Sequence, residues 1–272
     1  MKPELQTRVQ RYGWDKAAPY YEESWKDQLK PAQDRVLELA DLQPGESVLE
    51  TACGTGLVTE RIAGAIAPDG LVIATDLSEE MTRKTADRLQ NVNGIDRSVL
   101  RADAEALPLD DHSVDVAICA LGIMYYPDPL KGLKEMQRVL KPAGRAAVTI
   151  WGERSNCGWA EIFPIVEKRV ASDVCPMFFQ QGTGNTLEMT MKRAGFTEIH
   201  TERRKAELHF RDEETVVMAA FAGGPVALAY RKFDEETKMG AHEEYLESIA
   251  SYRNGSGYTI PGEFVYATAR KR

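Results

Sequence analysis

The feature that most constrains the fold of this chain is a regular alternation of β-rich runs and helical patterns between about residues 30 and 152. Short apolar or β-branched runs recur at residues 47–50, 71–76, 98–101, 114–119 and 146–150. Between the first two runs, Val58, Ile62 and Ile66 share one face of a predicted helix. A strand, a helix and another strand in regular succession predict a parallel sheet that helices cover on both faces.

Residues 153–272 are less regular. They contain a predicted strand that ends near residue 209, helical stretches near residues 212–222 and 234–251, and a final strand at residues 264–268. We therefore predict an α/β fold with a Rossmann-like, seven-stranded, mostly parallel sheet, helices on both faces and a helical cap. The predicted units are N-terminal lid helices (residues 1–35), an α/β core that binds the cofactor (residues 36–152), and a part that completes the sheet and carries the inserted substrate cap (residues 153–272).

Composition limits the classes of function. The chain has 272 residues, with 34 Lys and Arg against 42 Asp and Glu, and a formal net charge of −8. This acidic balance argues against binding to nucleic acid or an anionic membrane surface, since both need a basic face. No apolar run has the roughly 20 residues of a membrane span, and the first five residues lack the apolar core of a signal peptide. We expect a cytoplasmic protein with a small-molecule partner, and nothing in the sequence indicates its oligomeric state.

The cysteines and histidines predict neither a metal site nor a catalytic group. The four cysteines have neither paired spacing nor a Cys-x-x-Cys element, so we expect no disulfide and no zinc site. The histidines stand in a polar loop, in or beside a strand, or in a charged helix: His112, His200, His209 and His242. No catalytic residue is assigned.

A turn with two glycines follows the first strand, in the segment VLETACGTG at residues 48–56. Because glycine has no Cβ, Gly54 and Gly56 would let the backbone approach a ligand closely, although such turns are often plain connections. Asp76 strengthens the case for a ligand. It ends the second strand about 20 residues after Gly56, where a carboxylate can accept hydrogen bonds from both hydroxyls of a ribose. Asp103 ends the third strand, so acidic residues mark successive strand ends and predict a nucleoside site.

The charge near the turn favours one nucleoside over another. A dinucleotide site usually holds its pyrophosphate with Gly-x-Gly-x-x-Gly, and Thr59 stands in place of the third glycine. Glu50 precedes the turn, where it would repel phosphate and attract an ammonium or sulfonium group. S-adenosylmethionine has both cationic groups and no phosphate. We therefore predict this cofactor, with an NAD(P)-dependent oxidoreductase as the alternative.

Four segments, in this order, resemble a known family: Val48-Leu49-Glu50-Thr51-Ala52-Cys53-Gly54-Thr55-Gly56, Ala74-Thr75-Asp76-Leu77-Ser78, Arg101-Ala102-Asp103-Ala104-Glu105-Ala106-Leu107-Pro108 and Arg138-Val139-Leu140-Lys141-Pro142-Ala143-Gly144. They are similar to class I S-adenosylmethionine-dependent methyltransferases, in the branch that includes ubiquinone and menaquinone biosynthesis methyltransferases. The resemblance covers about residues 36–152. Three residues depart from the family pattern: Glu50 replaces the commoner Asp, and Ala52 and Ala143 replace glycines.

The resemblance implies roles for individual residues. Glu50 would serve the methionine end of the cofactor, Asp76 its ribose and Leu77 its adenine. Asp103 and Ala104 would hold the adenine edge, and Tyr21 matches a tyrosine of the family's N-terminal lid. The complete set of predicted cofactor-binding residues is Tyr21, Glu50, Ala52, Gly54, Gly56, Asp76, Leu77, Asp103, Ala104 and Cys119.

Methyl transfer from a sulfonium is an in-line displacement in which the cofactor supplies the reactivity and the protein aligns the acceptor. We expect a small organic acceptor of aromatic or lipophilic character, above the ends of the fourth and fifth strands. The predicted acceptor contacts are Tyr125, Trp151, Phe178, Phe179 and Tyr230. Phe178 and Phe179 could instead pack the cap against the core. A non-catalytic module that keeps the cofactor pocket is a further alternative, against which the intact Glu50, Asp76 and Asp103 argue.

Overall fold

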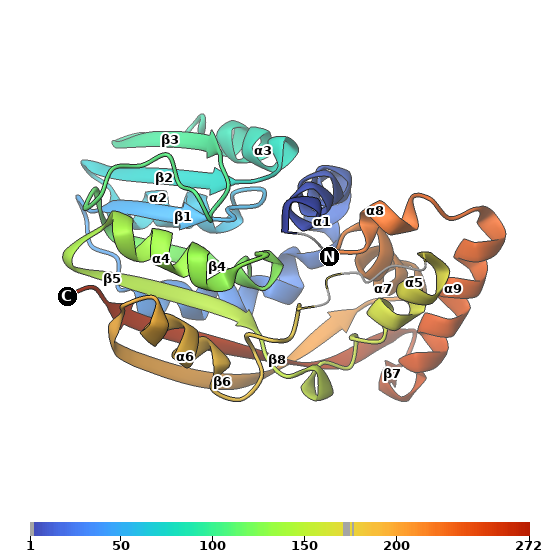
Figure 1. Cartoon of the computed structure of the whole chain (residues 1–272). Helices are drawn as coiled ribbons and strands as arrows, with labels where there is room; N and C mark the ends of the chain where they lie inside the picture. The colour runs from blue at the N-terminus through green and yellow to red at the C-terminus, as the bar shows by residue number, and fades with distance from the viewer. Residues whose placement is uncertain (1–2, 171–174, 176) are drawn as a thin grey trace.

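The computed structural model describes residues 3–170, 175 and 177–272, so Met1 and Lys2 of the start assessed for a signal peptide lie outside the described residues. One sheet forms its centre (Figure 1). The strands of this sheet are β1 (Ser47–Thr51), β2 (Gly70–Asp76), β3 (Ile95–Arg101), β4 (Val114–Ala120), β5 (Leu140–Trp151), β6 (Thr197–Phe210), β7 (Arg253–Asn254) and β8 (Gly257–Arg270).

The order of the strands is β3-β2-β1-β4-β5-β8-β6, and the two-residue strand β7 pairs with β8 outside this row. Strands β1 to β5 are parallel, whereas β8 is antiparallel to both β5 and β6. The predicted Rossmann-like sheet of seven mostly parallel strands is confirmed, with β7 as an addition. Because the order reverses between β1 and β4, the loops that follow these two strands diverge and leave room for a ligand.

Helices cover both faces of the sheet (Figure 1). On one face α1 (Pro3–Ala40), α2 (Leu57–Ile66) and α3 (Glu79–Leu89) contact one another, and on the other α4 (Pro129–Val139) contacts α6 (Thr186–Arg193). Side-chain caps fix two of the helix starts. Ser78 accepts the Met81 N–H at the start of α3, and Asp128 accepts the Lys131 N–H at the start of α4.

Helix α1 is continuous over 38 residues, so the predicted boundary at residue 35 falls inside it. Its second half packs on the sheet through the buried side chains of Leu29, Ala32 and Val36. Its first half extends past the carboxyl ends of the strands and contacts α8 (Ala227–Tyr230) (Figure 1). One helix therefore belongs both to the core and to the region beyond the strand ends.

The remaining helices gather beyond the carboxyl ends of the strands (Figure 1). They are α5 (Ile162–Val170), α7 (Glu213–Val217), the π-helical turn η3 (Met218–Ala222), α8 and α9 (Glu235–Ser248), with short 3-10 turns at η1 (Ile123–Tyr125), η2 (Arg154–Asn156) and η4 (Ala250–Tyr252). Helix α5 contacts α8 and α9. The cap is therefore built from the segment after β5 as well as from the segment between β6 and β8.

Ala52 and Ala143 stand where the resembled family has glycine, and both have left-handed backbone conformations. Their φ angles are 54° and 62°. A side chain in this conformation costs about 1–2 kcal/mol, a cost that glycine does not incur. The left-handed backbone explains why the family has glycine at these positions. In this chain, alanine adopts the same strained conformation at both, and Ala52 lies in the turn after β1.

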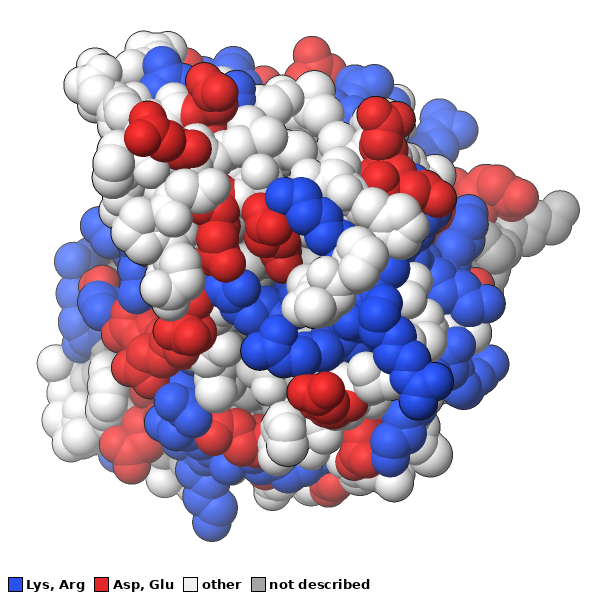
Figure 2. Space-filling view, turned by 90° about the vertical axis from the view of Figure 1, so that its left-hand side faces the viewer, with Lys and Arg blue, Asp and Glu red and all other residues white. Residues whose placement is uncertain are grey.

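The face formed by the amino ends of the strands lies opposite the cap and carries charges of both signs (Figure 2). A band of Lys and Arg crosses its middle, with acidic side chains around it. Ion pairs at these strand ends include Lys141 with Asp115 at 2.9 Å and Arg145 with Glu46 at 2.7 Å. Within the described part of the chain, none of the helices combines the length and the apolar character that crossing a membrane requires.

Candidate active site

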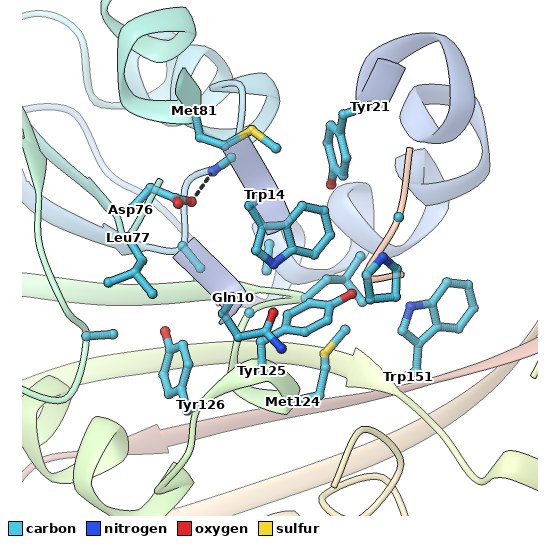
Figure 3. Close-up of a pocket in the computed structure, with 18 of the residues that line it drawn as sticks. Gln10, Trp14, Tyr21, Asp76, Leu77, Met81, Met124, Tyr125, Tyr126 and Trp151 are labelled. Atoms are coloured by element: carbon cyan, nitrogen blue, oxygen red, sulfur yellow. Dashed lines mark hydrogen bonds between the residues drawn. The ribbon is translucent and has the colours of Figure 1, made fainter. Parts of the chain in front are cut away.

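A cavity opens at the carboxyl ends of β1, β2, β3 and β4, with about 1020 Å³ of empty space, part of which is open solvent at its mouth. Two groups of lining residues differ in chemistry (Figure 3). We call the first group the acidic half, which comprises Gly54, Asp76, Leu77, Met81, Asp103 and Ala104. We call the second group the aromatic half, which comprises Trp14, Trp25, Met124, Tyr125, Trp151 and Trp159. Asp76 and Asp103 are the only charged side chains among the described residues that line the cavity.

The two glycines of the turn after β1 do different things. Gly54 has a φ of 57°, and a Cβ built on it would meet no atom within 4 Å, so its backbone faces open space in the cavity. Gly56 begins α2 with a φ of 84°, and a Cβ on it would lie 3.0 Å from the Thr85 Cα. Gly54 therefore leaves room for a ligand, whereas Gly56 allows the turn to pack closely against α3.

Asp76 is placed in the cavity by backbone donors. Its carboxylate accepts the Gly54 N–H at 2.9 Å and the Ser78 N–H at 2.8 Å, and the residue is 9% exposed. Burial raises the pKa of this carboxyl group to about 6. No ion pair joins it to a basic side chain anywhere in residues 3–170, 175 and 177–272. A buried carboxylate with backbone donors alone retains oxygen lone pairs that can accept hydrogen bonds from a ligand.

Glu50 lies behind the cavity wall, not in it. It is 1% exposed, and its Oε2 accepts a hydrogen bond from the Thr59 hydroxyl at 2.6 Å. Burial, with the neighbouring charge of Asp76, raises the pKa of Glu50 to about 8. Glu50 thus lies next to the cavity without lining it, and its role at the methionine end of the cofactor stays a prediction. Burial and the charges of Asp76 and Glu50 also raise the pKa of Tyr21, which lines the cavity.

The cavity brings together nine of the fifteen predicted site residues: Tyr21, Ala52, Gly54, Asp76, Leu77, Asp103, Ala104, Tyr125 and Trp151. Six others do not line it: Glu50, Gly56, Cys119, Phe178, Phe179 and Tyr230. Cys119 is fully buried beneath the wall, 3.5 Å from the Tyr126 hydroxyl. Tyr230 packs within the cap, where its hydroxyl lies 2.9 Å from His242 Nε2.

Phe178 and Phe179 form a second layer behind the aromatic half. Their ring centroids are 4.7 Å apart, and the ring of Phe178 lies 5.4 Å from Tyr125 and 5.5 Å from Trp159. In the structure, Phe178 and Phe179 pack between the cap and the core, the second of the two roles that the sequence left open for them. They hold the first layer in place, because edge-on aromatic contacts of this kind fix ring orientation.

Sequence reasoning missed the contribution of helix α1. The missed lining residues share one helical face with Tyr21 and stand on both sides of it in the sequence: Thr7, Gln10, Trp14, Trp25 and Leu29. Trp14 lies at the edge of the aromatic half that adjoins the acidic half (Figure 3). Its ring centroid is 5.0 Å from that of Tyr125. Counted from Thr7, i+3 and i+7 reach Gln10 and Trp14. Counted from Tyr21, i+4 and i+8 reach Trp25 and Leu29, so the helical spacing could have revealed this face. No comparable spacing in the sequence indicated that Met81, Met124 and Trp159 would line the cavity.

Two contacts hold α1 over the cavity. Asp15 accepts a hydrogen bond from the Ser78 hydroxyl at 2.6 Å, at the start of α3. In the last turn of α3, Arg88 donates to Glu22 of α1 at 2.8 Å and to the Thr55 carbonyl oxygen in the glycine turn at 3.0 Å. Arg88 also donates to Glu60 of α2 at 3.0 Å. One guanidinium group therefore joins α1, α2 and the glycine turn.

Comparison with known proteins identifies the family. The model of the ubiE/COQ5 methyltransferase family matches residues 24–205. The demethylmenaquinone methyltransferase of Staphylococcus carnosus is 27% identical over 215 residues, which cover 79% of this chain and 87% of that protein. The ubiquinone/menaquinone biosynthesis C-methyltransferase UbiE of Ectopseudomonas mendocina is 30% identical over 179 residues, which cover 60% of this chain and 70% of that protein.

A solved structure shares the fold. The YcgJ protein of Bacillus subtilis superposes with a TM-score of 0.62 at 16% identity, over 89% of this chain and 99% of that one. The family model covers well over half of the chain, and no finding favours an oxidoreductase. The chain belongs to the ubiE/COQ5 methyltransferase family and is an S-adenosylmethionine-dependent methyltransferase.

Proposed function

We propose that this enzyme methylates a small, uncharged ring compound of the quinol type, held in the aromatic half while the acidic half holds S-adenosylmethionine. One observation carries the proposal: the aromatic half adjoins the acidic half within one cavity, and Asp76 and Asp103 are the only charged groups among its described lining residues. Relatives named as demethylmenaquinone methyltransferases point to the same class of acceptor.

The described residues fit the cofactor in three respects. The bare Cα of Gly54 leaves space where any other residue would place a Cβ. Asp76 has oxygen lone pairs free to accept the ribose hydroxyls, and Asp103 stands at the end of the next strand to hold the adenine edge. The acidic half presents carboxylates to a ligand that has no phosphate and a positive charge. When bound, S-adenosylmethionine supplies the electrophilic methyl group.

The residues of the aromatic half orient the acceptor and exclude water. Trp14, Tyr125 and Trp151 present flat apolar surfaces that suit a planar ring. Burial raises the pKa of Tyr125 and of Tyr126 well above its ordinary value, so both phenols stay protonated and donate hydrogen bonds near neutral pH. In this proposal the protein contributes mainly proximity and orientation, which can lower a barrier by roughly 7–11 kcal/mol.

Methyl transfer to defined acceptors tests the proposed function. The purified enzyme would receive S-adenosylmethionine with an isotope-labelled methyl group and one of three acceptors: a short-chain demethylmenaquinol, phosphoethanolamine or glycine. We expect label in the quinol alone, because the two charged acceptors find no counter-ion among the described residues of the aromatic half. Label in either charged acceptor, or none in the quinol, would contradict this class of acceptor. Incubating the enzyme and labelled cofactor with cell extracts would then identify the natural acceptor.

Arg88 should influence cofactor binding without touching the cavity. Because it joins α1 to the glycine turn, Arg88→Ala is expected to loosen both and to weaken binding of S-adenosylhomocysteine by up to about fivefold, the range for partly exposed charged contacts. Arg83→Ala is the matched control, since Arg83 lies on the same helix and pairs only with Glu80 and Asp87 of α3 among the described residues. Calorimetric titration of S-adenosylhomocysteine into each variant measures the two affinities. Equal affinities would show that Arg88 has no such role.

A further inference from the structure

The polar groups of the cavity are unevenly distributed. Both carboxylates lie in the acidic half, and the described residues of the aromatic half include no Asp, Glu, His, Lys or Arg. An acceptor in that half therefore has to be recognised by uncharged groups. The lining residues near the boundary between the halves include one side chain that both donates and accepts hydrogen bonds through an amide, Gln10 of α1 (Figure 3).

Gln10 is a buried amide whose single recorded partner is weak. The residue is 6% exposed, and its Nε2 donates to the Cys175 sulfur at 3.2 Å. A thiol sulfur is a poor acceptor, and a glutamine amide can make up to four hydrogen bonds. Buried polar groups are normally paired, because leaving one unpaired costs about 1–3 kcal/mol. The amide of Gln10 therefore faces the cavity with hydrogen-bonding capacity that the thiol does not use.

The position of this amide matches the place where an acceptor has to be fixed. Figure 3 shows the Gln10 side chain in the cavity beside Tyr125, with Asp76 and Leu77 on one side and Met124 on the other. This is the boundary between the acidic and aromatic halves, where the reacting carbon or oxygen of the acceptor would meet the cofactor. We infer that Gln10 recognises a hydroxyl or carbonyl oxygen on the acceptor ring and is a specificity-determining residue for oxygenated, uncharged rings.

This inference rests on the proposed function and narrows it. A flat apolar pocket by itself accepts any ring of suitable size, and an added hydroxyl gains little in it. A buried amide changes this, since a ring without the oxygen leaves the amide unpaired whereas a ring with the oxygen satisfies it. The chemical class implied is therefore a quinol, phenol or quinone, and not a plain hydrocarbon or a charged amine.

Two ligands and two variants test the inference. The ligands are a short-chain demethylmenaquinol and the same ring system with hydrogen in place of both oxygens, each titrated into enzyme saturated with S-adenosylhomocysteine. The variants are Gln10→Leu and, as the matched control, Gln6→Leu. Gln6 is also on α1 and only 7% exposed, but it does not line the cavity. Thermal denaturation and titration with S-adenosylhomocysteine verify that each variant is folded and binds cofactor product.

We expect Gln10→Leu to weaken binding of the quinol by about threefold to tenfold, the range for one uncharged hydrogen bond, and to leave binding of the oxygen-free ring unchanged or stronger. Gln6→Leu should change neither. If Gln10→Leu leaves the ratio of the two affinities unaltered while the wild-type enzyme methylates the quinol, the inferred role of Gln10 is overturned and the proposed function stands. Failure of the wild-type enzyme both to bind and to methylate the quinol would overturn the proposed function, and with it this inference.

Discussion

Replacing Asp76 with alanine is expected to weaken the binding of S-adenosylhomocysteine by roughly 10-fold to 150-fold, which corresponds to about 1.5–3 kcal/mol for hydrogen bonds to a charged group. Asp76 is 9% exposed, and its carboxylate accepts the backbone N–H groups of Gly54 and Ser78. The ribose hydroxyls would add further donors to the same carboxylate. Alanine removes this acceptor, and water replaces it poorly in a buried site, so cofactor affinity should fall. Because the Gly54 and Ser78 N–H groups also lose their acceptor, the free energy of unfolding should fall as well.

The pH dependence of the same binding step gives a second readout. Burial raises the pKa of Asp76 to about 6, so the free enzyme protonates this carboxyl group as the pH falls below that value. The ligand favours the ionised form, and its affinity should therefore decline below about pH 6 in the wild-type enzyme but not in Asp76→Ala. Asp96→Ala, at an exposed position of β3, serves as the control. Wild-type affinity in Asp76→Ala would remove this residue from the cofactor site.

The arrangement of the sheet and the acidic half could be predicted because local patterns determine them. In a parallel sheet, residues at the ends of successive strands meet at one edge whatever their separation in sequence. Asp76 ends β2, and Asp103 lies in the loop just after β3, so their meeting in the cavity follows from the topology. The left-handed turn at Gly54 follows equally from the residue type.

The spacing within α1 shows which of its residues share a face, but the place of this face over the cavity could not be predicted in the same way. It depends on contacts between residues far apart in sequence, such as Asp15 with Ser78 and Glu22 with Arg88, and no local pattern shows that these side chains meet. Aromatic residues raise a related difficulty. Trp151 ends β5 and lines the cavity, whereas Phe178 follows β5 and lies one layer behind the cavity wall, although both are aromatic residues in this part of the chain. Depth within a layered aromatic cluster is set by tertiary packing, and sequence composition does not encode it.

Glu50 could be predicted as an acidic residue next to the site, but not as one held behind the wall. Strand residues alternate between the two faces of a sheet, and the sequence does not say which face adjoins the cavity. Because Glu50 is buried beneath α2 with Thr59 as its recorded hydrogen-bond partner, its charge is costly in the absence of a cationic ligand. The enzyme therefore carries at this position an acid that weakens its own fold.

Glu50→Gln should make the cofactor-free enzyme more stable. The pKa of Glu50 is about 8 in the folded chain and 4.5 in its ordinary state, so between these values the native state holds a proton that the unfolded chain releases. The free energy of unfolding then falls as the pH rises from about 4.5 to 8, and at pH 7 the loss amounts to roughly 3 kcal/mol. Glutamine removes this loss. At about 2–4 °C per kcal/mol, the melting temperature at pH 7 should rise by several degrees.

The same substitution should weaken cofactor binding, because glutamine cannot supply the negative charge that favours a sulfonium and an ammonium group. Melting curves from pH 4 to pH 8 separate this effect from a general gain in packing: the advantage of Glu50→Gln should vanish near pH 4, where both states of the wild-type chain are protonated. Glu23→Gln, at an exposed position of α1, should show neither change. Equal stabilisation of Glu50→Gln at pH 4 and pH 7 would show that the buried charge of Glu50 does not lower the stability of the enzyme. Binding of S-adenosylmethionine as tight as in the wild-type enzyme at pH 8 would show that this charge does not favour the cofactor.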